Sequence, residues 1–525
     1  MIKIIKNNWP IIAIILLSIF FRFWQIGTLP NGLFPDEAAN GLDVNSIFKG
    51  NIQPFYERGN GRESLFFYLL AFSVWLFGRG PWQHHIISAG IGVLTIFASY
   101  FLVKELFNKK IANITALLMA TSSFLTTVNR TAFRANMVPL FSTLVILFLV
   151  KYLKESENRK KIYYAFACGI SFGLGFYSYI SYRMMIPMLF GLAIIFLFTY
   201  RPSIRQQITS NLKYFWFSLL GFVLSFGWLG YYFFTHKGSF IGRAGQVSIF
   251  TESLNHGDVI GTFIKVLKLT FLGFFTNGDL NWRHNVSGYP FLSPFVSPFF
   301  GLALIIFSLS IFVYLFQAWK KTFNFEVFGK ALVAIWFWLM LIPEITTAEG
   351  IPHGLRLLGV VPAMFILPAW MISKAWDEIK TYIHIKQAAV AISIIFFATI
   401  IVYDYNLYFK IAANSLEYDY AFRSDLTFVS KYLNSRDQKN STYLSLDKFS
   451  VQTVEYFTTK TNNPYILLDP AKTYEISLKR GDQVLFTQST LYDRLEFLKN
   501  HPDVNLIKET KNRFGQIVML VYEKE

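Results

Sequence analysis

The sequence is poor in charged residues and has almost no cysteine. Charged side chains make up 15% of its 525 residues, against about 25% in a typical soluble protein. This deficit excludes an ordinary soluble fold, because it comes from long apolar segments that leave no room for charge. The lone cysteine, Cys168, excludes an internal disulfide, so any domain outside the cytoplasm must be held together by packing.

The chain also lacks the common nucleotide-binding and zinc-binding motifs. It has no Walker loop, no dinucleotide-binding fingerprint and no zinc-ligand spacing, so ATP-driven transport and nicotinamide chemistry are not indicated. The net charge of +17 is compatible with nucleic-acid binding. However, the basic residues lie between apolar runs, as in the positive-inside bias of membrane proteins. We therefore predict no nucleic-acid partner.

Apolar runs are what the sequence has instead. Residues 9–21, 112–127 and 140–150 are such runs, and a membrane helix needs about 20 mostly apolar residues. Five basic clusters recur between the runs, and placing all five in the cytoplasm makes the intervening helices come in pairs. We therefore predict an α-helical polytopic membrane protein with about eleven spans. The five clusters are 104–110, 151–161, 201–213, 320–330 and 374–386.

The short apolar segment 65–77 decides which loops lie outside. If it crossed the membrane, every later basic cluster would lie outside, against the cytoplasmic bias of Lys and Arg. We therefore predict an interfacial helix over 64–78 and a second span over 84–103. The irregular segments on the outer side are then 29–83, 129–137, 236–294 and 345–354. The paired spans are 111–128 with 138–153, 162–178 with 184–200, 214–235 with 295–316, and 331–345 with 355–373.

Composition changes after the last predicted span at 387–404. Short strand-like and helix-like segments alternate there, which favours a small α/β domain. We predict a transmembrane catalytic domain over 1–404 and a soluble extracytoplasmic α/β domain over 405–525. The predicted strands are 442–447, 464–469, 483–488 and 516–523, and the predicted helices are 424–434 and 489–499.

The outer segments carry positive charges, which oppose the general bias. A phosphate group held at the outer interface is one reason for them. Arg130 and Arg134 lie four residues apart and face one anion if their loop is helical, whereas contact with lipid headgroups is the alternative. We predict that Arg22 snorkels to the interface, and that His84 and His85 anchor a span there.

Asp36 and Glu37 follow Pro35 in the first outer segment. Proline suits the first position of a helix and acids suit its first turn, so helix capping alone explains the pair. A carboxylate base is the functional alternative. The two interpretations are compatible, because a helix N-terminus also keeps a carboxylate ionised.

Several outer segments together resemble a known family. The first segment reads LPNGLFPDEAANGLDVNSIFKGN over 29–51 and GNGRESLFFYLLAFSVWLFG over 59–78. The later ones read VNRTAFRANMVPL over 128–140, YSYISYRMMIPML over 177–189 and ITTAEGIPHGLRLLGVVP over 345–362. These segments resemble the GT-C glycosyltransferases, in particular the protein O-mannosyltransferases and the aminoarabinose transferases acting on lipid A. The resemblance covers about residues 1–404.

The resemblance implies a polyprenyl-phosphate-linked sugar as donor. It also implies inverting transfer to an acceptor hydroxyl on the extracytoplasmic side of the cell membrane. The family's catalytic carboxylate falls on Asp36, with Glu37 beside it, and the basic residue that meets the donor phosphate falls on Arg62. His353 and Arg356 match a PH-x-x-R pattern expected near that phosphate. The other predicted contacts are Arg183 for the donor phosphate, and Arg130, Arg134, Asn136 and Glu349 for substrate.

The resemblance leaves several points open. Asn136 occupies the place where many relatives carry an acid, so no metal ligand is predicted, although a divalent metal stays open as a cofactor. The acceptor is a protein, a glycolipid or a polysaccharide, and the sugar is not indicated. A transporter or flippase of lipid-linked sugars is the alternative function. It would place ionisable residues within spans and show related halves, whereas the charges here gather in the outer loops.

Overall fold

The computed structural model describes residues 2–59, 61–199, 204–320, 322–382, 385–436, 439–458 and 465–525. The chain forms two compact units, each built from separate stretches of sequence. The first comprises Met1–Trp24, Gln53–Phe66 and Ser88–Ala412, and the second comprises Gln25–Ile52, Phe67–Ile87 and Ala413–Glu525. The boundary predicted at 404/405, which assigned all of 29–83 to the membrane domain, remains a prediction about which parts fold independently.

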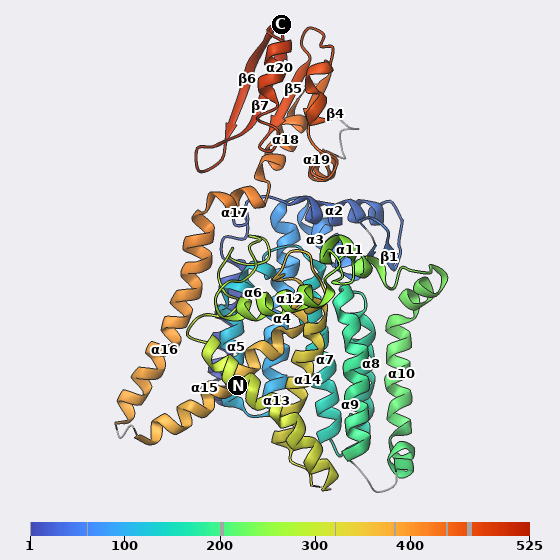
Figure 1. Ribbon diagram of the computed structural model, residues 1–525, viewed down its shortest axis with the longest axis vertical. Coiled ribbons are helices and arrows are strands. Elements are labelled where there is room, and N and C mark those ends of the chain that lie inside the picture. The colour runs from blue at the N-terminus through green and yellow to red at the C-terminus, as the bar shows by residue number, and fades with distance from the viewer. Residues whose placement is uncertain are drawn as a thin grey trace. The chain divides into compact units, whose positions relative to one another are not determined.

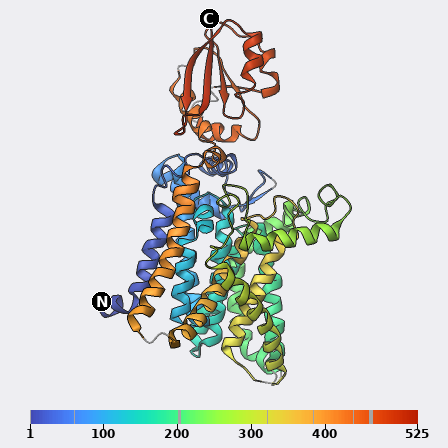
Figure 2. The same ribbon diagram turned by 60° about the vertical axis from the view of Figure 1, so that its left-hand side comes forward.

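The first unit is a bundle of apolar helices with a short β-hairpin (Figures 1 and 2). In the bundle, α8 packs against α7 and α10, α13 against α14 and α15, and α5 against α1 and α15. The hairpin is β1 (Phe55–Tyr56) and β2 (Arg62–Glu63), paired antiparallel. The helices are α1 (Ile2–Phe23), α4 (Pro81–Leu106, in this unit from residue 88), α5 (Lys109–Thr121), α6 (Ser123–Asn129), α7 (Met137–Lys154), α8 (Asn158–Gly175), α9 (Met185–Thr199), α10 (Ile204–Thr235), α11 (Glu252–Asn255), α12 (Val259–Phe275), α13 (Ser297–Trp319), α14 (Phe325–Ile345), α15 (Val361–Tyr382) and α16 (Lys386–Asn406).

Among the described residues, seven helices are long and apolar enough to cross a membrane, or eight if the bent pair α5 and α6 is one span. Three shorter apolar helices cover 8–23, 65–77 and 180–193. The multi-pass helical fold is thus confirmed, while the count of eleven and the interfacial position of 64–78 remain predictions. The predicted cluster 201–213 and the predicted helix 184–200 lie partly outside the described residues.

One predicted loop was wrong. Segment 236–294 was expected to be irregular, but it contains the 17-residue helix α12. The Asp258 carboxylate begins this helix by accepting a hydrogen bond from the Gly261 amide at 2.7 Å, as an N-cap residue does. Most of the glycine, histidine and asparagine residues on which the prediction rested flank this helix, and only Gly261 and Gly273 lie within it.

The pair α5 and α6 is bent by 61° within the bundle. Such a break leaves carbonyls at the end of one helix and amides at the start of the next without partners inside their own helix. The Arg22 guanidinium donates to the carbonyls of Met119 and Ala120 at 3.0 and 2.9 Å. The Asp404 carboxylate accepts from the Ser123 amide at 2.9 Å. Each charge has the sign that its helix end favours.

Arg22 also donates from Nε to the Asn129 side chain at 3.0 Å and is fully buried. The prediction that it snorkels to the interface was therefore wrong. Its physical role is to pair backbone carbonyls that have no water to bond.

The second unit contains a five-stranded mixed sheet with the order β4-β3-β5-β7-β6. Strands β3, β4 and β5 run parallel, and β7 runs antiparallel to β5 and β6. Leu426 and Val429 of one helix pack against Leu444 and Leu485 of the sheet. The strands are β3 (Thr442–Ser445), β4 (Ile466–Leu468), β5 (Gln483–Thr487), β6 (Val504–Lys511) and β7 (Ile517–Lys524). The helices are α2 (Pro35–Phe48), α3 (Leu65–Phe77, in this unit from residue 67), α17 (Leu416–Ala421), α18 (Ser424–Ser435), α19 (Val451–Thr458) and α20 (Arg494–Asn500).

The predicted α/β composition of this region is confirmed, with three elements missed. Helices α17 and α19 and strand β6 were not predicted. The side chains of β6 are mostly exposed. Its sequence, VNLIKETK, lacks the regular apolar alternation that marks a half-buried strand. The predicted strands 442–447, 483–488 and 516–523 correspond to β3, β5 and β7.

Helix α2 packs on α19 within this unit. A Cβ at Gly41 would lie only 2.5 Å from the Tyr456 ring, so the two helices approach closely at this glycine. The Thr453 hydroxyl donates to the Leu33 carbonyl at 3.1 Å. Asn31 donates to the buried Asp419 carboxylate. The segment around Asp36 is therefore held by the C-terminal region.

Close packing of α8 and α10 through glycine gives a test of the bundle. A Cβ at Gly221 of α10 would lie 2.5 Å from the Phe166 carbonyl oxygen and 3.0 Å from the Ile170 amide of α8, whereas Gly227 has open space. We expect Gly221→Ala to destabilise the protein by about 1–3 kcal/mol through overpacking. Gly227→Ala should not destabilise the protein, because its methyl group meets open space. Alanine is also favoured over glycine within a helix by up to about 1 kcal/mol. Thermal unfolding in detergent measures both, and equal stability of the two variants would contradict this packing.

Candidate active site

The two acids at the start of α2 have opposite surroundings. Glu37 is fully buried; its Oε2 accepts from the Phe34 amide at 3.0 Å, and its Oε1 lies 3.2 Å from Nε2 of His85. Asp36, at the second position of the helix, is exposed. Glu37 therefore caps and anchors the helix, while the Asp36 carboxylate faces outward at a helix end that favours negative charge.

The neighbouring histidines belong to this anchoring. His84 and His85 are fully buried, and the Nδ1 of His84 lies 3.0 Å from the Gly80 carbonyl. The His84 ring packs edge-on against Tyr456, with ring centroids 5.1 Å apart. Both rings are packed inside the second unit, and their predicted position at the membrane interface remains a prediction.

In the first unit, Glu63 binds two arginines from different loops. Its Oε2 lies 3.2 Å from Nε of Arg134, and its Oε1 lies 2.9 Å from a terminal nitrogen of Arg183. The side chains of Glu63, Arg134 and Arg183 are 3%, 19% and 12% exposed. Two guanidinium groups share one carboxylate, so the cluster keeps an excess of positive charge. Such a cluster suits an anion, because guanidinium groups bind carboxylate and phosphate in matching geometry.

Aromatic rings hold both arginines in place. The Arg134 guanidinium lies 5.4 Å from the Tyr179 ring centroid, and that of Arg183 lies 4.5 Å from the Phe240 centroid. The sequence prediction named both arginines but not their partner Glu63. Glu63 directly follows Arg62 in the sequence. Adjacent residues of a strand point to opposite faces, so this position was the signal that Glu63 has partners other than those of Arg62. Arg62 itself is buried on β2, opposite Tyr56.

The other predicted residues of the loop 129–137 form hydrogen bonds within the protein. The buried Arg130 donates to the carbonyls of Phe21 and Trp24 at 3.1 and 2.7 Å. The Asn136 amide donates to the Val128 carbonyl at 2.7 Å, and its oxygen accepts from Asn129 at 2.9 Å. Arg130 and Arg134 therefore have different partners, although they lie four residues apart.

The loop after α14 brings His353 and Arg356 to one turn. The Arg356 amide donates to the His353 carbonyl at 3.1 Å. The Arg356 guanidinium donates to the Glu349 carbonyl and lies 3.7 Å from the Glu349 carboxylate. The His353 amide donates to Oε1 of the buried Glu344 at 2.8 Å. These bonds fix the turn, with the Arg356 side chain directed toward Glu349.

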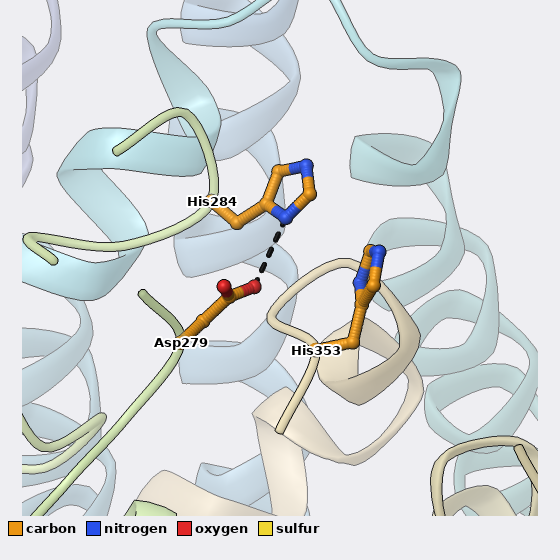
Figure 3. A group of neighbouring side chains, drawn as sticks. All are labelled: Asp279, His284 and His353. Carbon is orange, nitrogen blue, oxygen red and sulfur yellow. Dashed lines mark hydrogen bonds and ion pairs between the residues drawn. The ribbon is translucent and has the colours of Figure 1, made fainter. Parts of the chain in front are cut away.

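His353 also approaches two residues that the sequence prediction missed, Asp279 and His284 (Figure 3). Nδ1 of His284 lies 2.9 Å from Oδ2 of Asp279, and the rings of His284 and His353 lie 4.5 Å apart. Asp279 and His284 are five positions apart in the third loop, so no ligand-type spacing on a helix pointed to them.

Comparisons with known proteins agree with this architecture. Residues 64–231 match the family model described as dolichyl-phosphate-mannose-protein mannosyltransferase. ArnT from Cupriavidus metallidurans, solved with undecaprenyl phosphate bound, is 12% identical with a TM-score of 0.56 over 98% of each chain. The protein has a GT-C fold. The oligosaccharyltransferase AglB from Archaeoglobus fulgidus, in complex with an inhibitory peptide and a dolichol-phosphate, is 13% identical with a TM-score of 0.55, over 99% of this chain and 75% of AglB. No curated protein matches the sequence.

The GT-C resemblance predicted from the sequence is thus confirmed. Two of the segments that carried it, 128–140 and 177–189, lie inside the matched range, while 29–51 and 345–362 lie outside it. The roles predicted for individual residues remain predictions.

The shared carboxylate of Glu63 can be tested by stability. In Glu63→Gln the guanidinium groups of Arg134 and Arg183 lose their negative partner in a buried setting. We expect a loss of about 1–3 kcal/mol in the free energy of unfolding. Glu57→Gln is the matched control, because Glu57 is exposed and accepts one hydrogen bond from Tyr232 at 3.2 Å. It should stay within about 0.5 kcal/mol. Denaturation in detergent measures the free energy of unfolding of both variants. A Glu63→Gln protein as stable as its control would contradict the pairing of Glu63 with the two arginines.

Proposed function

We propose that the protein is a membrane glycosyltransferase that moves a sugar from a polyprenyl-phosphate donor to an acceptor hydroxyl on the extracytoplasmic face, with inversion. The observation that carries this proposal is the GT-C fold, which extends over 98% of both chains in the match to a structure with undecaprenyl phosphate bound. The acceptor is a hydroxyl of a protein, a glycolipid or a polysaccharide.

Asp36 is the proposed general base. Its carboxylate is exposed, while the neighbouring Glu37 is buried against His85, so Asp36 is the acid of the pair that solvent and substrate can reach. The acceptor oxygen attacks the anomeric carbon and its proton passes to Asp36. The bond from the anomeric carbon to the phosphate oxygen breaks at the same time. The lipid phosphate leaves with the electron pair and needs no general acid, because it is a stable anion.

Basic residues of the first unit are the proposed contacts of the donor phosphate. Arg183 belongs to the positively charged Glu63 cluster, Arg62 adjoins Glu63 on β2, and His353 and Arg356 share one turn. Positioned guanidinium groups stabilise a phosphate as its charge grows during bond cleavage. Arg130, Arg134, Asn136 and Glu349 are proposed to support substrate binding, although Arg130 and Asn136 also close the loop that carries them.

The transporter alternative receives less support from the arrangement of charges. A transporter for lipid-linked sugars needs ionisable residues near the middle of its spans. The ionisable residues of the described chain that were assigned roles above lie instead at helix ends or in loops. Asp36 starts α2, Glu63 is on the hairpin, and His353 follows α14.

The base role predicts a loss of rate in Asp36→Asn. Asparagine keeps the size and the hydrogen-bond acceptor, but it cannot take a proton at neutral pH. We expect transfer to fall about 10²–10⁴-fold, with undecaprenyl phosphate binding unchanged. Cells lacking the protein are complemented with each variant, and mass spectrometry of their glycans measures transfer. Binding of undecaprenyl phosphate to the purified protein is measured separately.

Two further variants distinguish a loss of catalysis from a loss of stability or of lipid binding. Glu37→Gln should lower stability more than transfer, because Glu37 pairs with His85. Arg62→Ala should weaken undecaprenyl phosphate binding by about tenfold to 150-fold, the value of a charge-assisted hydrogen bond. Near-normal transfer by Asp36→Asn would end the base assignment, and unchanged lipid binding by Arg62→Ala would end the phosphate assignment.

The proposed topology is open to a labelling test. Cysteines introduced at Glu157 and Tyr492, in a Cys168→Ala background, should react with an impermeant maleimide from opposite sides of the membrane. Loop 151–161 is the proposed cytoplasmic side and 405–525 the proposed outer side. Reaction of both cysteines from the same side would overturn this assignment. Tyr492 suits the test because its side chain is 85% exposed.

A further inference from the structure

Asp279, His284 and His353 form a compact group between two loops of the first unit (Figure 3). Asp279 and His284 lie in the connection from α12 to α13, and His353 lies in the connection that follows α14. Each residue offers one ligand atom, and the three atoms lie within 4.8 Å of one another. Asp279 and His284 are buried, and His353 is half-buried.

The surrounding backbone holds these side chains in position. Oδ1 of Asp279 accepts from the Asn281 amide at 2.8 Å, and Oδ2 accepts from the Gly354 amide at 2.8 Å. A Cβ at Gly354 would lie 2.8 Å from the His284 carbonyl oxygen, so the two loops meet at this glycine. The Phe133 ring packs edge-on against His284, with centroids 5.7 Å apart. The group is therefore assembled by tertiary packing and does not depend on a flexible surface loop.

The charge around the group favours a cation. The carboxylates of Asp279 and Glu344 are both buried, and Glu344 accepts from the His353 amide at 2.8 Å. A buried carboxylate is costly unless it is paired with charge or coordinates a metal. The two imidazoles and the Asp279 carboxylate provide nitrogen and oxygen ligands and one negative charge.

We propose that Asp279, His284 and His353 bind a divalent transition-metal ion, with zinc the ion that best fits their chemistry. Zinc takes imidazole nitrogen and carboxylate oxygen at about 2.0–2.2 Å, usually in tetrahedral geometry. The three ligand atoms lie within 4.8 Å of one another, so the side chains must move closer together for one ion to contact all three. Magnesium and calcium fit less well, because they prefer oxygen ligands throughout. Three protein ligands leave one coordination position for water or an anion.

A metal at this site cross-links the third and fourth outer loops. The chain has one cysteine, so no disulfide within it can make this link. The link fixes the turn that carries Arg356, which is a proposed phosphate contact. Metal binding itself does not depend on the proposed glycosyl transfer.

The test is direct metal binding by the full-length protein, purified in detergent without a histidine tag and stripped with a chelator. We expect the wild type to bind a single equivalent of Zn²⁺, measured by elemental analysis after gel filtration. Co²⁺ should give the visible absorption of a tetrahedral site. His284→Gln and His353→Gln should lose both signals, and Zn²⁺ should raise the thermal midpoint of the wild type but not of these variants.

His236→Gln is the matched control, because His236 is exposed and stacks on Tyr232 outside this group. It should bind metal as the wild type does. Asp279→Asn adds a variant that keeps the acceptor for the Gly354 amide and so guards against a folding defect. Absence of binding by the wild type, or full binding by both His284→Gln and His353→Gln, overturns the proposal. Transfer measured on the same samples separates the two proposals: failed transfer with intact Zn²⁺ binding leaves the metal site standing.

Discussion

Pairing of backbone polar groups inside an apolar bundle is the constraint on which the first unit depends. Carbonyls and amides within hydrocarbon have no water to bond, so they must be paired inside helices or by side chains. The bend between α5 and α6 interrupts that pairing. Arg22 supplies positive charge to the carbonyls of Met119 and Ala120, and Asp404 supplies negative charge to the Ser123 amide. Charged residues at such a place are therefore part of the fold and need no catalytic role.

The same principle separates structural charges from candidate functional ones. Arg130 bonds to the carbonyls of Phe21 and Trp24, and Glu37 bonds to the Phe34 amide and His85. By contrast, the Glu63 cluster sets two guanidinium groups against one carboxylate. An excess of one charge in a partly buried place has an electrostatic cost, which binding of the proposed anionic substrate would offset. This excess is the physical reason to connect the cluster with a phosphate.

The two proposals use different chemistry. Asp36 is an exposed carboxylate at a helix end, which keeps it ionised and able to accept a proton. Asp279, His284 and His353 gather nitrogen and oxygen ligands in a buried place, which suits a cation. The first comes from the resemblance to GT-C enzymes, and the second comes from tertiary contacts alone.

The sequence by itself determined the class of the protein, because apolar runs, basic clusters and low charge are properties of local composition. Its motifs also indicated the GT-C resemblance, and alternation of short segments indicated the α/β region. Only the tertiary structure decided which charged residues meet. Glu63 joins Arg134 and Arg183 across 71 and 120 positions, and Asp279 meets Gly354 across 75. Such pairings leave no periodic trace in the sequence, because they depend on how distant loops fold together and not on neighbouring residues.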